Sequence, residues 1–286
     1  MKPTQIISAI TFLALAASVS AETKFHADYE DGSISSGYPT AGPFRIWVPG
    51  IEPNLAVAKD ACYMVKGGAH NTKWAVANKV TLDDPDYIGG NYPRSEFGFG
   101  GPRGTSYNSG DRGAYSFSMQ FPDLVPSVKG DRPAPKEDVV WQFKHYDGGH
   151  DIHIALVGVN LVLGWGGNVY KQVIIDDVMP YVNKWMDFHF EVLWKDDETG
   201  WFTLEMKLPG ERRLGHKVEK KDIQTFVTAS PDGTKWGGHG MIQYGVYRNS
   251  ANSTAGDTKT LIVWHDEVTA INFSQPPDQQ PPPSDQ

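Results

Sequence analysis

A recurring pattern of short strands and turns, along nearly the whole chain, is the feature that most constrains its fold. Short runs rich in β-branched and aromatic residues are separated by Gly, Pro, Asp and Asn, and helical periodicity is nearly absent. This spacing predicts an all-β protein, best fitted by a single β-jelly roll in which two antiparallel sheets leave a concave cleft. We expect only minor helical turns, such as 220–226. The expected strands are 73–81, 94–98, 114–121, 139–146, 151–158, 169–175, 185–194, 201–208, 240–248 and 260–273.

The two ends of the chain differ in composition from the part between them. A basic Lys2, an apolar run at 6–17 and small residues before a cleavage point predict that residues 1–21 are a signal peptide. The apolar run is too short to span a bilayer, so we expect a secreted protein, extracellular or periplasmic, that does not bind a membrane. Residues 22–274 are expected to form one domain, and the Pro-rich segment 275–286 a disordered tail.

Charge and cysteine content narrow the possible partners. The formal net charge of −8 argues against a nucleic-acid-binding protein. It leaves room for an acidic substrate, because a locally basic cleft can override the overall charge. Cys62 is the only cysteine, so no internal disulfide can form and the core alone must stabilise the fold. We expect a monomer.

The stretch VVWQFKHYDGGHDIHIALVG predicts a hairpin with a two-residue turn at Gly148 and Gly149, both at positive φ. In this register Lys144 lies opposite His153. Because side chains alternate along a strand, the hairpin has two faces. The apolar face is expected to join the core: Trp141, Phe143, His145, Ile152, Ile154 and Leu156. The polar face is the first candidate for a functional site: Gln142, Lys144, Tyr146, Asp151 and His153.

Two further strands carry polar side chains with a period of two. In PRSEF, Arg94 and Glu96 share a face, where they could be either functional or a structural ion pair. In MIQYGVYRN one face is shared by Gln243, Gly245, Tyr247 and Asn249. Gly245 is expected to leave open space beside Tyr247 for a ligand.

The RSE strand, the QF strand and the GVYR strand, in this order, resemble those of the β-jelly-roll polysaccharide lyases. The hairpin WMDFHFEVLWKDDETGW lies between the last two strands and fits the same pattern. The similarity covers about residues 25–273 and is greatest to glucuronan lyases and heparin lyase I-like enzymes, with alginate lyases more distant. It implies an endo-acting carbon–oxygen lyase whose partner is an acidic polysaccharide, with β-1,4-glucuronan as the best candidate.

The resemblance also implies roles for individual residues. Arg94 and Gln142 would neutralise the C6 carboxylate, and Tyr247 matches the tyrosine of the family's GxY motif and would act on the leaving oxygen O4. Three candidates remain for the base that removes the C5 proton. They are His153, Lys144, which stands where relatives often have histidine, and Tyr247 itself in a syn elimination.

Further substrate contacts are expected from five residues: Glu96, Gln243, Asn249, Arg248 and His70. Gln243 stands where relatives often have lysine, and His70 is an alternative base that could reach the cleft from a loop. Loops 100–112 and 230–240 are expected to select the polymer. Trp165 is either a platform for stacking a sugar or a buried loop anchor.

The segments FHADYEDG and WHDEV resemble the terminal segments that hold a structural calcium in many jelly-roll proteins that act on carbohydrates. Glu30, Asp31 and Asp266 would supply hard oxygen ligands. The alternative is two acidic, exposed strand ends. No organic cofactor is expected, and no His/Cys spacing supports a catalytic zinc.

Two alternatives to a glucuronan lyase remain open. The chain could be a non-catalytic carbohydrate-binding jelly roll, or a lyase acting on alginate or a heparin-like polymer. A glycoside hydrolase ranks last, because no strand carries the spaced carboxylates of such enzymes.

Overall fold

The computed structural model describes residues 22–34, 45–47, 58–89, 92–98, 105–125, 136–145, 148–250 and 257–273. The expected signal peptide, the Pro-rich tail and residues 100–104 of loop 100–112 lie outside these residues. In the described part, no helix is long and apolar enough to cross a membrane.

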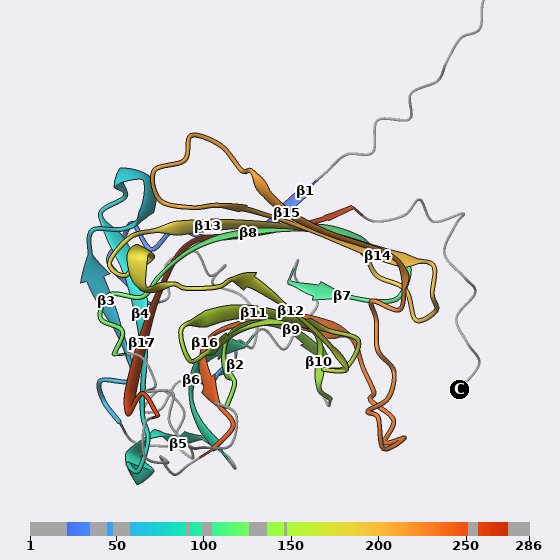
Figure 1. The fold of residues 1–286 in the computed structure, drawn as a ribbon, viewed down its shortest axis with the longest axis horizontal. Coiled ribbons are helices and arrows are strands. Elements are labelled where there is room, and N and C mark those ends of the chain that lie inside the picture. The colour runs from blue at the N-terminus through green and yellow to red at the C-terminus, as the bar shows by residue number, and fades with distance from the viewer. Residues whose placement is uncertain are drawn as a thin grey trace, which may run out of the picture.

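Two antiparallel sheets pack face to face (Figure 1). The back sheet has the strand order β15 (His216–Ile223), β14 (Gly200–Lys207), β13 (Met186–Leu193), β8 (Arg112–Gln120), β17 (Thr260–Phe273), β4 (Trp74–Thr81) and β3 (Cys62–Lys66), with β1 (Glu22–Ala27) paired to β17. The front sheet has the order β12 (Tyr170–Ile175), β11 (Asn160–Trp165), β10 (His150–Val157), β9 (Asp138–His145), β16 (Gly240–Arg248), β6 (Tyr92–Gly98) and β2 (Arg45–Trp47). At its margins β5 (Ile88–Gly89) pairs with β6, and β7 (Ser106–Tyr107) pairs with β16. Three short 3₁₀ turns are Ala69–Asn71, Pro85–Tyr87 and Met179–Tyr181. The all-β jelly-roll prediction is confirmed.

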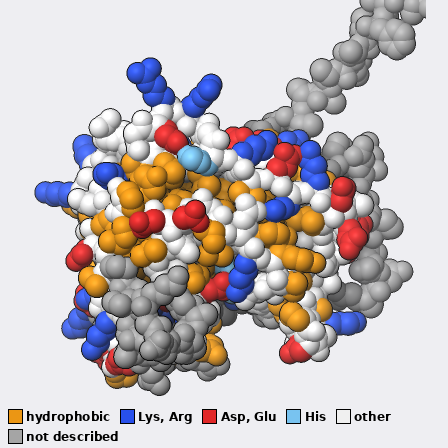
Figure 2. All heavy atoms as spheres, in the orientation of Figure 1, with side chains coloured by type: hydrophobic (Ala, Val, Ile, Leu, Met, Phe, Trp, Pro, Cys, Tyr) orange, Lys and Arg blue, Asp and Glu red, His pale blue; other side chains and the backbone are white. Residues whose placement is uncertain are grey.

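The core lies between the two sheets and contains many aromatic rings. Figure 2, in the orientation of Figure 1, shows hydrophobic side chains gathered across the middle of this face, with charged side chains around them. Strict alternation along β13 and β14 directs every second side chain into it. At its centre Trp141 of the front sheet stacks on Phe117 of the back sheet, with ring centroids 3.8 Å apart, and Phe188 stacks on Phe117 at 4.9 Å. The contact between Trp141 and Phe117 fixes the two sheets against each other, because stacked rings tolerate little sliding in a close-packed interior.

The predicted strands are largely confirmed, and the bounds of β16 and β17 agree with the predicted ones. The helical turn at 220–226 is wrong, because β15 runs through His216–Ile223. This strand forms the edge of the back sheet, and only Val218 is buried in it. This segment therefore forms a strand because it pairs with β14, and its few apolar residues do not predict one.

The hairpin between β9 and β10 has a different register from the predicted one. Neither Gly148 nor Gly149 adopts positive φ. The turn is wider, and the N–H of His145 donates to the carbonyl of Gly149 at 3.1 Å. His150 therefore pairs with Lys144, and a bulge follows between His150 and Ile152.

The tryptophan of a distant loop explains why glycines occupy this turn. A Cβ at Gly148 or Gly149 would lie 2.5 or 2.6 Å from the ring of Trp236. The two glycines thus provide space for Trp236 in loop 230–240, rather than left-handed backbone angles.

Candidate functional site

One row of paired residues crosses the front sheet on the face directed away from the core. Its members come from five neighbouring strands, β12, β11, β10, β9 and β16, and are Lys171, Gly164, His153, Gln142 and Gln243. Residues of opposite parity, such as Phe143 and Ile242, point into the core. The alternation predicted from sequence therefore places Gln142, His153 and Gln243 together, although His153 pairs with Gln142 rather than with Lys144.

An amide network joins three of the predicted residues. The side-chain N–H groups of Gln142 donate to Glu96 Oε1 at 2.5 Å and to Gln243 Oε1 at 3.0 Å. Glu96 is buried, and burial raises the pKa of its carboxyl, against the opposing charges of Arg94 and Lys144. Gln142 can therefore donate to a further acceptor only by exchanging one of these internal bonds.

Arg94 and Tyr247 face each other across β6 and β16. The guanidinium carbon of Arg94 lies 4.8 Å from the centroid of the Tyr247 ring, and Nε of Arg94 is buried without a hydrogen-bond partner. Tyr92 packs its ring edge against Tyr247 at 5.9 Å. Burial raises the pKa of the Tyr247 phenol, Arg94 opposes this, and Glu96 adds to it. The phenol is therefore protonated at neutral pH and can donate a proton.

Gly245 does not leave open space beside Tyr247. Its φ is +136°, and a Cβ there would lie 2.2 Å from the carbonyl oxygen of Ser95. The glycine instead allows β16 to bulge between Tyr244 and Tyr247 while β6 approaches closely. This bulge helps to set the position of Tyr247.

His150 joins the site although the sequence did not indicate it. Its ring centroid lies 4.9 Å from that of His153 and 6.4 Å from that of Tyr247. A two-residue turn had placed His150 at the hairpin tip, and the wider turn moves it beside Lys144. The only sequence signal that could have found it is the adjacent pair of His150 and Asp151 directly after the two glycines.

Glu137 is a second residue missed from sequence. Its Oε1 lies 2.7 Å from Nζ of Lys171, and its Oε2 lies 3.7 Å from Nε2 of His153. Burial raises the pKa of Glu137, but His153 and Lys171 together outweigh burial and hold it at about 2. Glu137 is thus an ionised carboxylate bridging β10 and β12. It precedes β9, so no strand alternation could assign it to a face.

Asp151 was predicted to lie on the polar face of the hairpin, but the structure buries it. Oδ2 of Asp151 accepts from the Tyr107 hydroxyl at 2.7 Å, and Oδ1 accepts from the N–H of Val227 at 2.6 Å. Nε2 of His145 lies 3.2 Å from Oδ1, so His145 is a core histidine as predicted. Asp151 therefore ties the start of the 226–236 loop to the hairpin.

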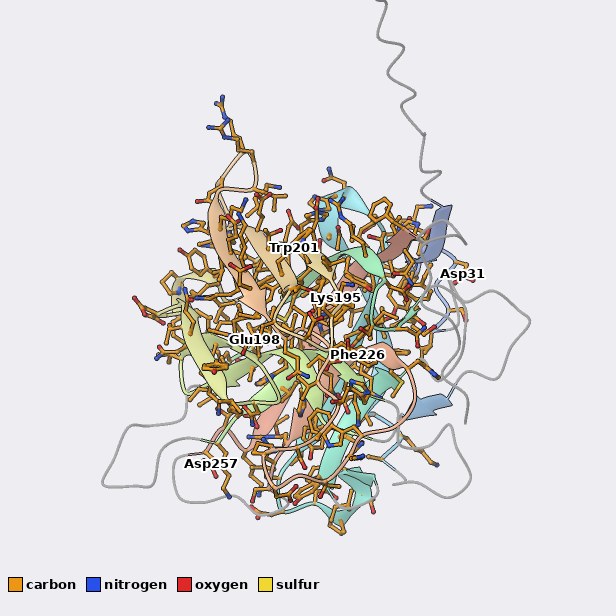
Figure 3. The ribbon with its side chains drawn as sticks, turned by 90° about the vertical axis from the view of Figure 1, so that its right-hand side faces the viewer. Asp31, Lys195, Glu198, Trp201, Phe226 and Asp257 are labelled. Carbon is orange, nitrogen blue, oxygen red and sulfur yellow. The ribbon has the colours of Figure 1, made fainter. Side chains whose placement is uncertain are left out.

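This loop begins at one end of the sandwich, where Figure 3 labels Lys195 and Phe226. The N–H of Phe226 donates to the carbonyl of Lys195 at 2.8 Å. Near this end Trp165 packs edge-on against Phe202 at 6.1 Å. Trp165 is thus anchored between the sheets, and the loop-anchor alternative is the one the geometry favours.

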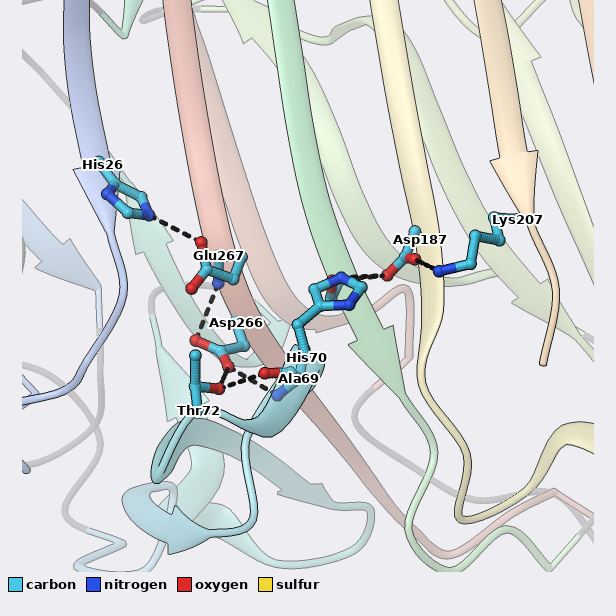
Figure 4. A network of polar contacts seen from close by, with 9 residues as sticks. His26, Ala69, His70, Thr72, Asp187, Lys207, Asp266 and Glu267 are labelled. Atoms are coloured by element: carbon cyan, nitrogen blue, oxygen red, sulfur yellow. Dashed lines mark hydrogen bonds and ion pairs between the residues drawn. The ribbon is translucent and has the colours of Figure 1, made fainter. Parts of the chain in front are cut away.

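The structure does not bring Arg248 or His70 to this group. Arg248 is only 3% exposed and binds Asp138 through Nε at 2.8 Å, so its guanidinium is already paired inside the protein, and its contact with substrate stays a prediction. His70 lies on the outer face of the back sheet, 3.0 Å from Asp187 Oδ1 (Figure 4), and is therefore on the opposite side of the sandwich from the group on the front sheet. Asn249 lies at the end of β16, where its side chain donates to the carbonyl of Glu137 at 3.4 Å.

The three predicted calcium ligands serve as backbone acceptors. Oδ2 of Asp266 accepts from the N–H of Ala69 at 2.8 Å (Figure 4), and Oε1 of Glu30 accepts from the N–H of Lys73 at 2.6 Å. Asp31 accepts from the N–H of Ser33 within its own turn. Among the described residues no group of three or more His, Cys, Asp or Glu side chains is placed to hold a metal ion. Each of these carboxylates therefore has backbone N–H partners, and calcium binding stays a prediction.

Comparison with known proteins identifies a matching family and similar solved structures. A family model described as polysaccharide lyase matches residues 67–269. The endo-β-1,4-glucuronan lyase of the fungus Trichoderma reesei has a similar structure, with a TM-score of 0.54 and 19% identity over 87% of this chain and 95% of that one. A marine alginate lyase from Aplysia kurodai gives a TM-score of 0.52 and 10% identity over 87% and 99%. Among curated proteins no sequence matches significantly.

Proposed function

Because this chain belongs to the polysaccharide lyase family, we propose that it cleaves a uronic-acid polysaccharide by β-elimination, with β-1,4-glucuronan as its substrate. The family assignment confirms the resemblance drawn from the RSE, QF and GVYR strands. The observation that carries the reaction is the Arg94–Tyr247 pair beside Gln142 on one face of the front sheet.

Arg94 supplies the positive charge that the reaction requires. Removal of the C5 proton places a second negative charge next to the C6 carboxylate, so this carboxylate must be neutralised first. Arg94 has a buried Nε without a partner, and its planar, positively charged guanidinium offers donors that match a carboxylate. Gln142 adds an N–H donor once it releases Glu96 or Gln243.

Tyr247 supplies the proton for the leaving group. Its phenol is protonated at neutral pH, because burial raises its pKa. It is also half-buried rather than enclosed, so a chain lying along the front sheet can reach it. Protonation of O4 as the C4–O4 bond breaks avoids expelling an alkoxide.

Two observations support a polyuronate substrate. Arg94, Lys144 and Lys171 lie on one face together with Glu96 and Glu137, so these side chains carry an excess of positive charge on a protein whose overall charge is negative. The Trichoderma reesei structure with the same fold is named as acting on β-1,4-glucuronan. We further propose that the protein acts as a secreted monomer that cuts within its polymer.

The test is incubation of the purified protein with glucuronan, alginate and a heparin-like polymer. The expected result is new ultraviolet absorbance from the unsaturated uronyl product, greatest with glucuronan, and early release of medium-sized fragments. Tyr247→Phe should abolish the signal without changing the circular dichroism spectrum. Binding of a polymer without product from any of them would instead indicate a carbohydrate-binding protein and overturn the proposal.

A further inference from the structure

His150 occupies a particular place among the titratable groups of the front sheet. Its ring lies between His153, at 4.9 Å, and Tyr247, at 6.4 Å. Its side chain is partly exposed, whereas His153 is 1% exposed, and its Nδ1 is buried without a hydrogen-bond partner. His150 is therefore an imidazole beside the proton donor that a ligand can still reach.

We propose that His150 is the catalytic base that removes the C5 proton, an inference that rests on the proposed function. The imidazole removes the C5 hydrogen as a proton, and the electrons of the C5–H bond form the C4=C5 double bond. The C4–O4 bond breaks, and O4 leaves with the proton of the Tyr247 phenol. Transfer of a proton from the His150 imidazolium to the Tyr247 phenolate, directly or through water, restores both groups.

The positions of the two residues fit the stereochemistry of a gluco-configured uronate. In that configuration the C5 hydrogen and O4 lie on the same side of the sugar ring, so the base and the acid must approach from one side. His150 on β10 and Tyr247 on β16 both project from the same face of the front sheet. One sheet face can therefore serve both atoms.

The surroundings keep His150 in the form that accepts a proton. Burial lowers the pKa of His150 well below its ordinary value, and nearby positive charges lower it further. The groups that contribute this charge, from β10, β9, β6 and β12, are His153, Lys144, Arg94 and Lys171. Glu96 and Glu137 are the carboxylates on the same face, and each is bound to another partner, Gln142 or Lys171.

The same geometry gives His153 a different role. Its ring is buried over Gly164, and its Nε2 faces Glu137 at 3.7 Å. A buried ring beside an ionised carboxylate cannot reach C5 of a bound sugar. His153 is a positioning residue that packs against His150.

The test compares four full-length proteins on glucuronan: wild type, His150→Ala, Tyr247→Phe and His216→Ala. His216 is an exposed histidine on β15 that contacts Glu211, so its variant controls for loss of an imidazole elsewhere. We expect His150→Ala to lower kcat about 100-fold or more, the usual share of a general base, with KM changed far less. Added imidazole should restore part of kcat in His150→Ala and have no effect on Tyr247→Phe. Circular dichroism and thermal unfolding check that each variant is folded.

The outcomes separate this proposal from the proposed function. Wild-type kcat in His150→Ala, or a loss that imidazole does not restore, would show that Tyr247 or Lys144 takes the proton and would overturn the assignment. In either case lyase activity of the wild type would stand. Absence of unsaturated product from the wild-type protein on every uronate polymer would overturn both.

Discussion

The imidazole of His153 occupies the space where a side chain at position 164 would stand. His153 and Gly164 pair across β10 and β11, and a Cβ on Gly164 would lie 2.1 Å from Cε1 of His153. The glycine therefore determines where the ring of His153 rests, and through the 4.9 Å contact between the rings it also limits the position of His150.

Gly164→Ala is expected to displace this ring. The added methyl group overlaps a buried side chain, so we expect a loss of about 1–3 kcal/mol in the free energy of unfolding, together with a lower kcat. Gly237→Ala is the matched control, because a Cβ at Gly237 would meet nothing within 4 Å. Urea unfolding and initial rates on glucuronan measure both effects. Equal behaviour of the two variants would contradict the packing argument.

Arg94→Lys should impair the reaction although it keeps the charge. The guanidinium of Arg94 lies against the Tyr247 ring and offers a planar set of donors, which an ammonium group cannot reproduce. Loss of a charge-assisted hydrogen bond of about 1.5–3 kcal/mol corresponds to about a 10- to 100-fold fall in kcat/KM. Steady-state kinetics on glucuronan provide the measurement. Full activity of the lysine variant would mean that charge alone suffices.

Glu137 should stabilise the protein at neutral pH and cease to do so in acid. Its pKa is about 2 in the folded protein against an ordinary value of 4.5, because His153 and Lys171 outweigh burial. A lowered folded pKa gives stability that is fully present above about pH 4.5 and is lost as the pH falls towards about 2. The difference corresponds to about 3 kcal/mol.

Glu137→Gln tests this pH dependence directly. The free energy of unfolding of the variant, from urea denaturation, should fall less than that of wild type between pH 6 and pH 3. Other carboxylates titrate in both proteins and cancel in the comparison. Parallel curves would show that Glu137 is not held ionised by its neighbours.

Asp151→Ala should destabilise the protein strongly. The substitution removes the acceptor of the Tyr107 hydroxyl and of the Val227 N–H, and it leaves His145 buried without its partner. Breaking a buried pair by removing one member costs about 3–5 kcal/mol. The midpoint of urea unfolding measures the loss, and limited proteolysis should show cleavage in the 226–236 loop. Asp232→Ala, in an exposed turn of the same loop, should change the midpoint far less.

Part of the site could be read directly from the sequence. Alternation along β9 and β16 indicated that Gln142 and Gln243 share a face, and the structure joins them by a hydrogen bond. The order of the RSE and GVYR strands suggested a common site for Arg94 and Tyr247, which pair across β6 and β16. These relationships follow from the two-residue period of a strand, which is local and visible in sequence.

Other parts depended on contacts between distant segments. His150 enters the front face because a wider turn and a bulge shift the hairpin, and the bulge accompanies the burial of Asp151 against Val227. Glu137 reaches His153 and Lys171 from outside any strand. A bulge reverses the side-chain parity that follows it, so a single unforeseen bulge is enough to misplace a residue.

The pattern of residues along the chain was enough to predict an all-β fold, the course of most strands, and a face shared by Gln142, His153 and Gln243. It could not predict that Asp151 leaves this face or that the imidazole of His150 lies beside Tyr247, because register depends on where the turn closes. Long-range pairing of strands also separates His70 and Arg248 from the site. It decides in which sheet, and at which end of a strand, a side chain lies, and the local sequence pattern does not contain this information.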